Sequence, residues 1–290
     1  MPKTTNQQLA GNFHMTATCK ICEAPTDHFG RQLVLAKFDA EYRRCRDCGY
    51  VFIVDPHWLD EAYSNAIAAL DTGIVTRNLW LADATSALLA LSLRDVRRTL
   101  DFGGGSGLLV RLMRDRGHDF SWYDAYCPNV LAAGFEAEPD DQFDMVTAFE
   151  LFEHLLEPIT SVEQLRARAP VIVFSTELVP AGVCGPDNWW YFAPESGQHI
   201  GFFTVASLTI LARRLGLELS TNGRNLHVLA PHRVSSALLS VLGKPSRASW
   251  LAKYGIRRSL AHRDAALLQA RLRTAGAPGE PQEHGRSSGL

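Results

Sequence analysis

Four cysteines near the N-terminus have the spacing of metal ligands. Cys19 and Cys22 form one CxxC pair, and Cys45 and Cys48 form a second pair, with 22 residues between the pairs. The two-residue gap lets both thiols of a pair turn toward one ion, and Gly49 suits the tight turn that follows. Four thiolates fill a tetrahedral shell, so the spacing predicts a closed structural Zn²⁺ site and not a catalytic one. Four unliganded thiols and a redox pair are the alternatives.

A glycine-rich turn indicates a bound nucleotide. It lies between a candidate strand and a candidate helix and reads Leu100-Asp101-Phe102-Gly103-Gly104-Gly105-Ser106-Gly107. Glycine at such a turn lets the backbone approach a nucleotide closely. A dinucleotide fingerprint would need glycine where Leu108 stands, whereas a GxGxG pattern fits Gly103, Gly105 and Gly107.

An aspartate follows at the expected distance. Asp124 closes the next candidate strand, 23 residues after Asp101. An acidic side chain at this place accepts hydrogen bonds from ribose hydroxyls. The order of strand, glycine turn, helix, strand and acid therefore supports a cofactor site over a mere connection.

Alternating strand and helix signals provide the elements that hold these residues. A parallel sheet covered by helices on both faces, a doubly wound α/β fold, is expected from this alternation. Thr204 is a good N-cap for the later helix, and Gly216 is a good stop. The candidate strands are 99–102, 120–123, 145–149, 171–174, 217–219 and 226–229, and the candidate helices are 107–116 and helices within 60–93.

The chain divides into five expected segments. A flexible extension occupies residues 1–14, because Met15 is a second plausible start, and a zinc-binding module occupies 15–59. The main domain with its helical lead-in spans 60–230, a C-terminal helical segment spans 231–274, and a tail of Gly, Pro, Ser and Glu at 275–290 is expected to be disordered.

Composition limits the partners. The chain has 290 residues, 46% of them hydrophobic, enough for a sizeable core. Its net charge of -2 creates no general attraction for nucleic acid or an anionic membrane, although residues 244–274 hold eight Lys or Arg against one acid, Asp264. No stretch reads as a signal peptide or membrane span, so a cytoplasmic protein without nucleic-acid partners is expected.

The cofactor motifs resemble those of a known family. Asp101 to Gly107 resembles motif I of class I S-adenosylmethionine-dependent methyltransferases, and Asp124 resembles their ribose-binding acid. The run 143–154 resembles their fourth strand and following loop, including the pair Glu153-His154. This resemblance implies S-adenosylmethionine as cofactor, held by Asp101, Gly103, Gly105, Gly107, Asp124 and Glu150.

The leading CxxC pairs narrow the resemblance to zinc-containing relatives of the sugar C-methyltransferases of deoxysugar pathways. It implies a small-molecule acceptor, a sugar or a nucleotide-linked sugar. The loop 188–199, dense in aromatic and polar residues, is the expected acceptor wall. His199 stands before Phe202 and Phe203 as in those enzymes and is the predicted general base, with His154 as a second catalytic candidate. A packing or helix-capping histidine is the alternative for His199, and a residue that anchors the backbone near the loop is the alternative for His154 and Glu150.

Two other functions compete with small-molecule methylation. One is an RNA-binding methyltransferase that grips phosphates through the zinc module and the basic segment 244–273, although the net charge opposes it. The other is a noncatalytic zinc-containing interaction protein that has kept the fold and lost the activity. The intact glycine turn argues against this alternative. The sequence leaves the accepting atom and the oligomeric state open.

Overall fold

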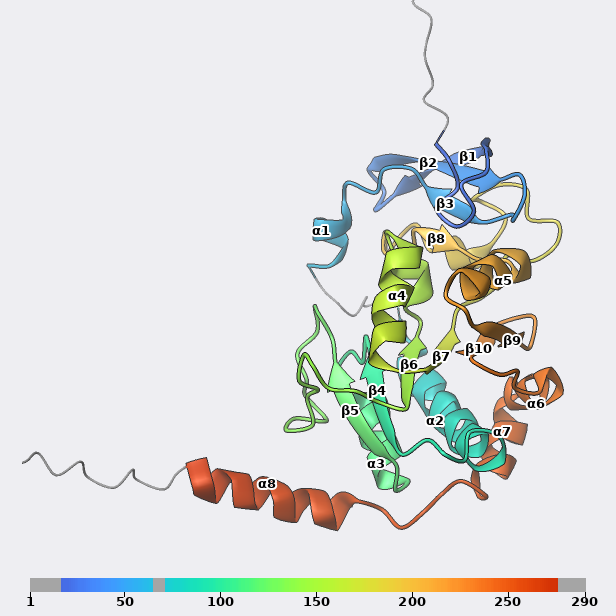
Figure 1. Cartoon of the computed structure of the whole chain (residues 1–290). Helices are drawn as coiled ribbons and strands as arrows, with labels where there is room; N and C mark the ends of the chain where they lie inside the picture. Colours follow the sequence, from blue (N-terminus) through green and yellow to red (C-terminus); the bar gives the residue numbers. More distant parts are fainter. Residues whose placement is uncertain (1–16, 65–70, 276–290) are drawn as a thin grey trace, which may run out of the picture.

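The main sheet is the frame of the molecule. The structure is a computed structural model that describes residues 17–64 and 71–275. The strands of this sheet are β4 (Arg98–Phe102), β5 (Asp119–Tyr123), β6 (Met145–Phe149), β7 (Val171–Ser175), β9 (Glu218–Thr221) and β10 (Leu226–Ala230). They are ordered β5-β4-β6-β7-β10-β9 (Figure 1). The first four strands are parallel, whereas β10 is antiparallel to both of its neighbours.

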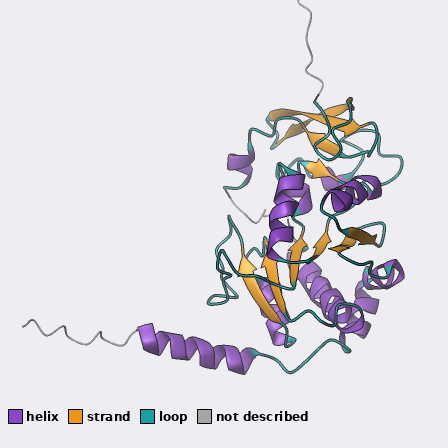
Figure 2. Ribbon diagram, in the orientation of Figure 1, coloured by secondary structure: helices purple, strands orange, loops and turns teal. Residues whose placement is uncertain are grey.

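Helices cover both faces of this sheet, which confirms the predicted doubly wound α/β fold (Figure 2). On one face, α2 (Ile74–Leu91) and α3 (Leu108–Asp115) pack over Met145 and Val173. On the other face, α4 (Pro158–Arg168) and α5 (Val205–Arg214) pack over Val146 and Phe174. Because both faces are buried, β6 and β7 are apolar at nearly every position.

Local sequence signals correctly predicted several boundaries of helices and strands. The side chain of Thr204 accepts a hydrogen bond from the Ser207 amide, and Ser207 Oγ accepts one from the Thr204 amide, so α5 begins with a complete capping box. Gly216 follows the end of α5 in the left-handed conformation, as its predicted role as a stop requires. The predicted strands match β4, β5, β6, β7, β9 and β10 to within two residues at each end.

A second sheet lies at the cysteine end and was not predicted. It contains β1 (Thr26–Val34), β2 (Phe38–Cys45), β3 (Val51–Ile53) and β8 (Gly201–Phe202), in that order and all antiparallel. β8 comes from the segment between β7 and α5, so the main domain supplies a strand to the N-terminal module. A Cβ at Gly201 would overlap the Tyr50 hydroxyl, which explains glycine at this crossing.

Three short helical elements lie in the connections between strands. α1 (Leu59–Ala62) follows the N-terminal strands, and the 3₁₀ turns η1 (Phe152–His154) and η2 (Trp190–Phe192) follow β6 and β7. After the main sheet come α6 (Ser236–Leu242), α7 (Pro245–Ala252) and α8 (Ala261–Ala275), the last of which extends away from the body (Figure 1). In the described part of the chain, no helix has the length and apolarity that crossing a membrane requires.

One buried carboxylate attaches α8 to the body. Asp264 is 3% exposed and accepts hydrogen bonds from Arg114 at 2.7 and 2.9 Å and from Arg111 at 2.6 Å. Although burial opposes it, hydrogen bonding by these guanidiniums holds the pKa of Asp264 below its usual range. The one acid of the basic segment is therefore a structural anchor. The predicted extension 1–14 and the predicted tail beyond Ala275 lie outside the described residues.

Candidate cofactor and acceptor site

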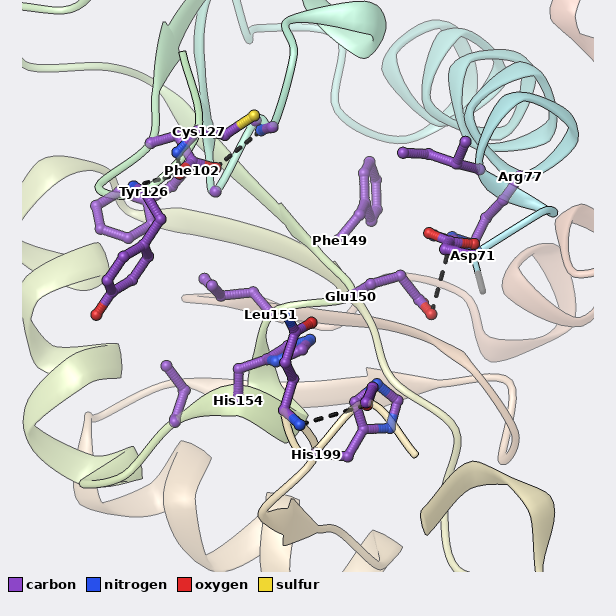
Figure 3. A pocket seen from close by; sticks show the side chains of 18 of the residues that line it. Asp71, Arg77, Phe102, Tyr126, Cys127, Phe149, Glu150, Leu151, His154 and His199 are labelled. Atoms are coloured by element: carbon purple, nitrogen blue, oxygen red, sulfur yellow. Dashed lines mark hydrogen bonds and ion pairs between the residues drawn. The ribbon is translucent and has the colours of Figure 1, made fainter. Parts of the chain in front are cut away.

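One cavity joins the predicted cofactor residues to the predicted catalytic histidines. It has a volume of about 990 Å³ and lies at the carboxyl ends of β4, β5 and β6. Ligands bind at such strand ends in open α/β sheets. Phe102 and Tyr126, which neighbour the glycine turn and Asp124 in the chain, lie toward one end of the cavity, and His154 and His199 lie toward the other (Figure 3). The structure thus brings both predicted catalytic histidines and all predicted cofactor residues except Gly107 around a single space.

The glycine turn has the backbone that its pattern predicts. Gly103, Gly105 and Gly107 have φ values of 74°, 52° and 84°, a region that favours glycine. A side chain at Gly107 would clash with Asn129 and Ala132, so close packing enforces that glycine. A side chain at Gly105 would meet no atom within 4 Å. Gly105 therefore leaves room for a ligand along the turn.

Asp124 is held by three main-chain amides, one from the glycine turn and two from residues that follow Asp124 in the chain. Its Oδ2 accepts a hydrogen bond from the Gly105 amide at 2.9 Å, and its Oδ1 accepts two at 2.8 Å from the amides of Tyr126 and Cys127. This arrangement positions the carboxylate beside the glycine turn. Each carboxylate oxygen can accept more than one hydrogen bond, so the side chain keeps capacity for a hydroxyl.

Asp101 lies beneath the turn, cut off from solvent. Its side chain is 3% exposed, and its Oδ1 accepts a hydrogen bond from Thr147 Oγ at 2.7 Å. Burial raises the pKa of Asp101 to about 7, the hydrogen bond from Thr147 opposes this, and the nearby Asp124 adds to it. Thr147 was not among the residues predicted for the site. Its signal was a single polar residue in an otherwise apolar strand, in register with Asp101 on the neighbouring strand.

Glu150 leaves β6 with a strained backbone. Its φ is 50°, a value that side-chain-bearing residues rarely adopt and that clusters at functional sites. Its Oε1 accepts a hydrogen bond from Ser175 Oγ at 2.6 Å, and its Oε2 lies 3.8 Å from Arg77 Nε. Burial, reinforced by Glu153, raises the pKa of Glu150 to about 7. The side chain lies between the two ends of the cavity (Figure 3).

His154 is held from the side of α1. Its Nδ1 lies 3.0 Å from the Tyr63 hydroxyl, and the Tyr63 ring stacks on Tyr126 at 4.7 Å. Burial and the neighbouring His199 lower the pKa of His154 to about 4, against opposing effects of Glu153 and the Gln198 main chain. The imidazole is therefore neutral at physiological pH.

His199 lies beside His154. Its Nδ1 is 2.7 Å from the carbonyl oxygen of Tyr191, to which it can only donate, so in the neutral tautomer that fits this contact the proton is on Nδ1 and Nε2 carries the lone pair. The two imidazole rings meet edge to face, with centroids 5.0 Å apart. Tyr191 also donates its hydroxyl to Glu153 Oε1 at 2.6 Å. Glu153 is fully buried, and sequence reasoning gave it no role of its own.

The aromatic loop divides between packing and the cavity. Tyr191 and Phe192 are buried, and Trp189 packs against both of them. Trp190 is 73% exposed and lines the cavity. Of the two tryptophans in this loop, only Trp190 is therefore placed to contact an acceptor.

The four predicted zinc ligands converge. Cys19 and Cys48 have sulfur atoms 3.6 Å apart, those of Cys22 and Cys45 are 3.4 Å apart, and all four lie within 4.8 Å of one another. Sulfurs bound to one tetrahedral zinc at about 2.3 Å lie roughly 3.8 Å apart, so this set fits the ion. The amides of Ile21 and Cys48 point at Cys19 and Cys45 sulfur, and none of the four forms a disulfide. The cluster is therefore compatible with a bound zinc ion.

Comparisons with known proteins agree on one domain. A family model described as a methyltransferase domain matches residues 76–222. No protein of curated function matches the chain in sequence.

Three solved structures resemble part of the chain at low sequence identity. TnmH is 18% identical over 60% of this chain and 61% of its own, with a TM-score of 0.43. The neocarzinostatin O-methyltransferase NcsB1, solved with S-adenosyl-L-homocysteine and a dihydroxynaphthoic acid, is 14% identical over 60% and 61%, with a TM-score of 0.44. Human N-acetylserotonin methyltransferase, solved with SAM, is 15% identical over 61% and 66%, with a TM-score of 0.40. The match thus spans less than two thirds of each relative's length.

Proposed function

The chain belongs to the methyltransferase family whose domain model matches residues 76–222. We propose that it transfers a methyl group from S-adenosylmethionine to a small molecule that carries a sugar. The observation that carries the proposal is the single cavity of about 990 Å³. Methyl transfer is a direct displacement, so donor and acceptor must lie together in one space. A cavity with a glycine turn at one end and two histidines at the other provides that space. The proposed catalytic domain, residues 60–230, contains the matched region.

The cofactor end is assigned to the residues around the turn. Asp101, Gly103, Gly105, Asp124 and Glu150 line the cavity and would hold the nucleoside and the amino-acid part of the cofactor. Gly107, which packs against Asn129 and Ala132 outside the lining, would fix the shape of the turn. The sulfonium of S-adenosylmethionine supplies the methyl group and leaves as a neutral thioether. Asp124 would accept from the ribose hydroxyls, since its carboxylate is already oriented by three amides.

His199 is the proposed general base. Its Nδ1 is committed to the Tyr191 carbonyl, which leaves the Nε2 lone pair for a proton of the acceptor. His154 lies beside it and is held neutral by burial. We assign His154 to the same end of the site, where it would orient the acceptor.

A sugar is the proposed acceptor because this end combines an exposed indole with many hydrogen-bonding groups. Trp190 offers a flat apolar surface, and Glu195, Ser196 and Asn225 add polar groups to the lining. The four-thiolate zinc would stabilise the N-terminal sheet. That sheet includes β8, which begins two residues after His199, so the ion would support the acceptor end indirectly.

Calorimetry tests the cofactor assignment. S-adenosylmethionine or its demethylated product is expected to bind and raise the melting temperature, whereas NAD is expected to do neither. Binding of NAD alone would overturn the assignment.

Turnover with a panel of nucleotide sugars tests the base. His199→Ala is expected to lose about 100-fold to 10,000-fold in turnover while cofactor affinity stays nearly unchanged. The matched control is His232→Ala, which removes an exposed imidazole outside the cavity lining and is expected to keep full turnover. If His199→Ala keeps more than about a third of wild-type turnover, the histidine is not the base.

A further inference from the structure

A second group of metal-ligand side chains lies at the acceptor end of the cavity. Glu153, His154 and His199 each offer one ligand atom, and these atoms lie within 4.8 Å of one another. Glu153 and His154 belong to η1, and His199 lies two residues before β8. Figure 3 shows His154 and His199 together, away from the end marked by Phe102 and Tyr126.

Glu153 has an oxygen that the described residues do not satisfy. Its side chain is 0% exposed, and its Oε1 accepts the Tyr191 hydroxyl proton at 2.6 Å. Within residues 17–64 and 71–275, its buried Oε2 has no hydrogen-bond partner. Burying a carboxylate oxygen without a partner is costly, so a cation or a proton is expected to face this oxygen.

Both histidines are oriented as metal ligands are. A ligating imidazole keeps its second nitrogen on a fixed oxygen, which sets the tautomer and the ring plane. His199 Nδ1 is on the Tyr191 carbonyl at 2.7 Å, and His154 Nδ1 is on the Tyr63 hydroxyl at 3.0 Å. His154 Nε2 lies 4.0 Å from Glu153 Oε1. Two imidazoles and one carboxylate, each with a ligand atom within 4.8 Å of the others, are thus available to a common ligand.

We propose that Glu153, His154 and His199 bind one divalent transition-metal ion, such as Zn²⁺ or Co²⁺, and that the bound ion blocks the base. Two imidazoles and one carboxylate form a donor set that these ions favour, with a further position open toward the cavity. Ligands of one such ion lie roughly 3.3 Å apart, so the three side chains approach one another by about 1 Å on binding. The ion occupies His199 Nε2, the atom that would take the acceptor proton. The inhibitory part of this inference rests on the proposed function, whereas the binding part does not.

Cobalt titration tests the binding part. Protein whose cysteine site is filled with zinc is titrated with CoCl₂ while the visible spectrum and the metal content are followed. Wild type is expected to take up one Co²⁺ per chain, with visible bands but without the intense thiolate charge-transfer band that cobalt in the cysteine site would produce. Glu153→Gln and His154→Ala are each expected to weaken this uptake by about tenfold or more. His232→Ala is the matched control and is expected to bind as wild type does.

Two outcomes would overturn the site. One is the absence of uptake beyond the first ion, and the other is uptake that neither variant weakens. Melting temperatures identify a variant that has failed to fold, and the remaining ligand variant then decides the question.

Inhibition is measured separately. Added Co²⁺ is expected to reduce turnover over the same concentration range in which it binds. If Co²⁺ binds and turnover stays the same or rises, the ion does not block the base, although the metal site itself is still supported. A failure to methylate any acceptor would contradict the proposed function but leave the spectroscopic result unaffected.

Discussion

Replacing Asp101 with asparagine tests the electrostatics under the glycine turn. Burial raises the pKa of this carboxyl from 3.8 to about 7. The folded protein therefore keeps a proton that the unfolded chain releases between about pH 4 and pH 7. Because the folded state binds more protons in that window, the free energy of unfolding of the wild type falls as the pH rises through it. Asparagine cannot ionise, so the variant escapes this loss.

The size of the effect follows from the shift. At about 1.4 kcal/mol per pKa unit, a rise from 3.8 to about 7 sets a ceiling of about 4 kcal/mol on the penalty above pH 7. Asparagine retains an oxygen for the 2.7 Å hydrogen bond from Thr147, but its amide must fit where a carboxylate oxygen was. We expect Asp101→Asn to exceed wild type in free energy of unfolding by about 1–3 kcal/mol at pH 8.5.

Urea unfolding and thermal melting at about pH 5.5 and pH 8.5 measure the difference. This range avoids stronger acid, in which protonation would displace thiolates from zinc. The difference in free energy of unfolding between the variant and wild type is expected to grow by about 2 kcal/mol from the lower to the higher pH. Asp140→Asn, a change at an exposed aspartate, is the control and is expected to show no such growth. A variant that is less stable than wild type at pH 8.5, or an advantage independent of pH, would refute the reasoning.

Three further perturbations test the other parts of the structure. Cys45→Ser is expected to lose the one zinc that wild type retains through dialysis and to destabilise the N-terminal sheet; wild type without zinc by metal analysis would contradict the site. Asp124→Ala is expected to weaken S-adenosylmethionine binding by about 1–3 kcal/mol in calorimetry, and unchanged affinity would exclude the ribose role. Asp264→Asn removes the buried charge partner of Arg114 and leaves it only the half-exposed Asp119, so the free energy of unfolding is expected to fall by about 2–4 kcal/mol and α8 to become open to proteolysis; unaltered cleavage would show that the ion pair does not attach the helix.

Local chemistry explains why much of the cofactor end could be predicted. Gly103, Gly105 and Gly107 need a positive φ, and Thr204 needs only the amides of its own helix. Strands buried on both faces are continuous apolar runs, so β6 and β7 were visible without their neighbours. The CxxC pairs likewise carry their geometry within a few residues.

The direction and the partners of each strand could not be predicted in this way, because they depend on residues that are far apart in the chain. The sequence showed a strand at 226–229 but not that β10 runs antiparallel to β7. It showed no strand at Gly201, because a two-residue strand has no periodicity, and the pairing of β8 with β3 is settled by packing near Tyr50. The 15–59 module and the main domain therefore share a sheet that neither segment indicates alone.

By itself, the sequence determined the residue types that chemistry requires: four thiols in two pairs, a glycine turn with two aspartates, and two histidines. Only the tertiary structure decided what those residues face. It buried Asp101 against Thr147, brought the rings of His154 and His199 to within 5.0 Å of each other in the cavity lining, and buried Glu153 with an oxygen unmatched in the described chain. The physical reason is that burial and hydrogen-bond partners, which set the charge and tautomer of a group, come from segments that meet only when the chain has folded.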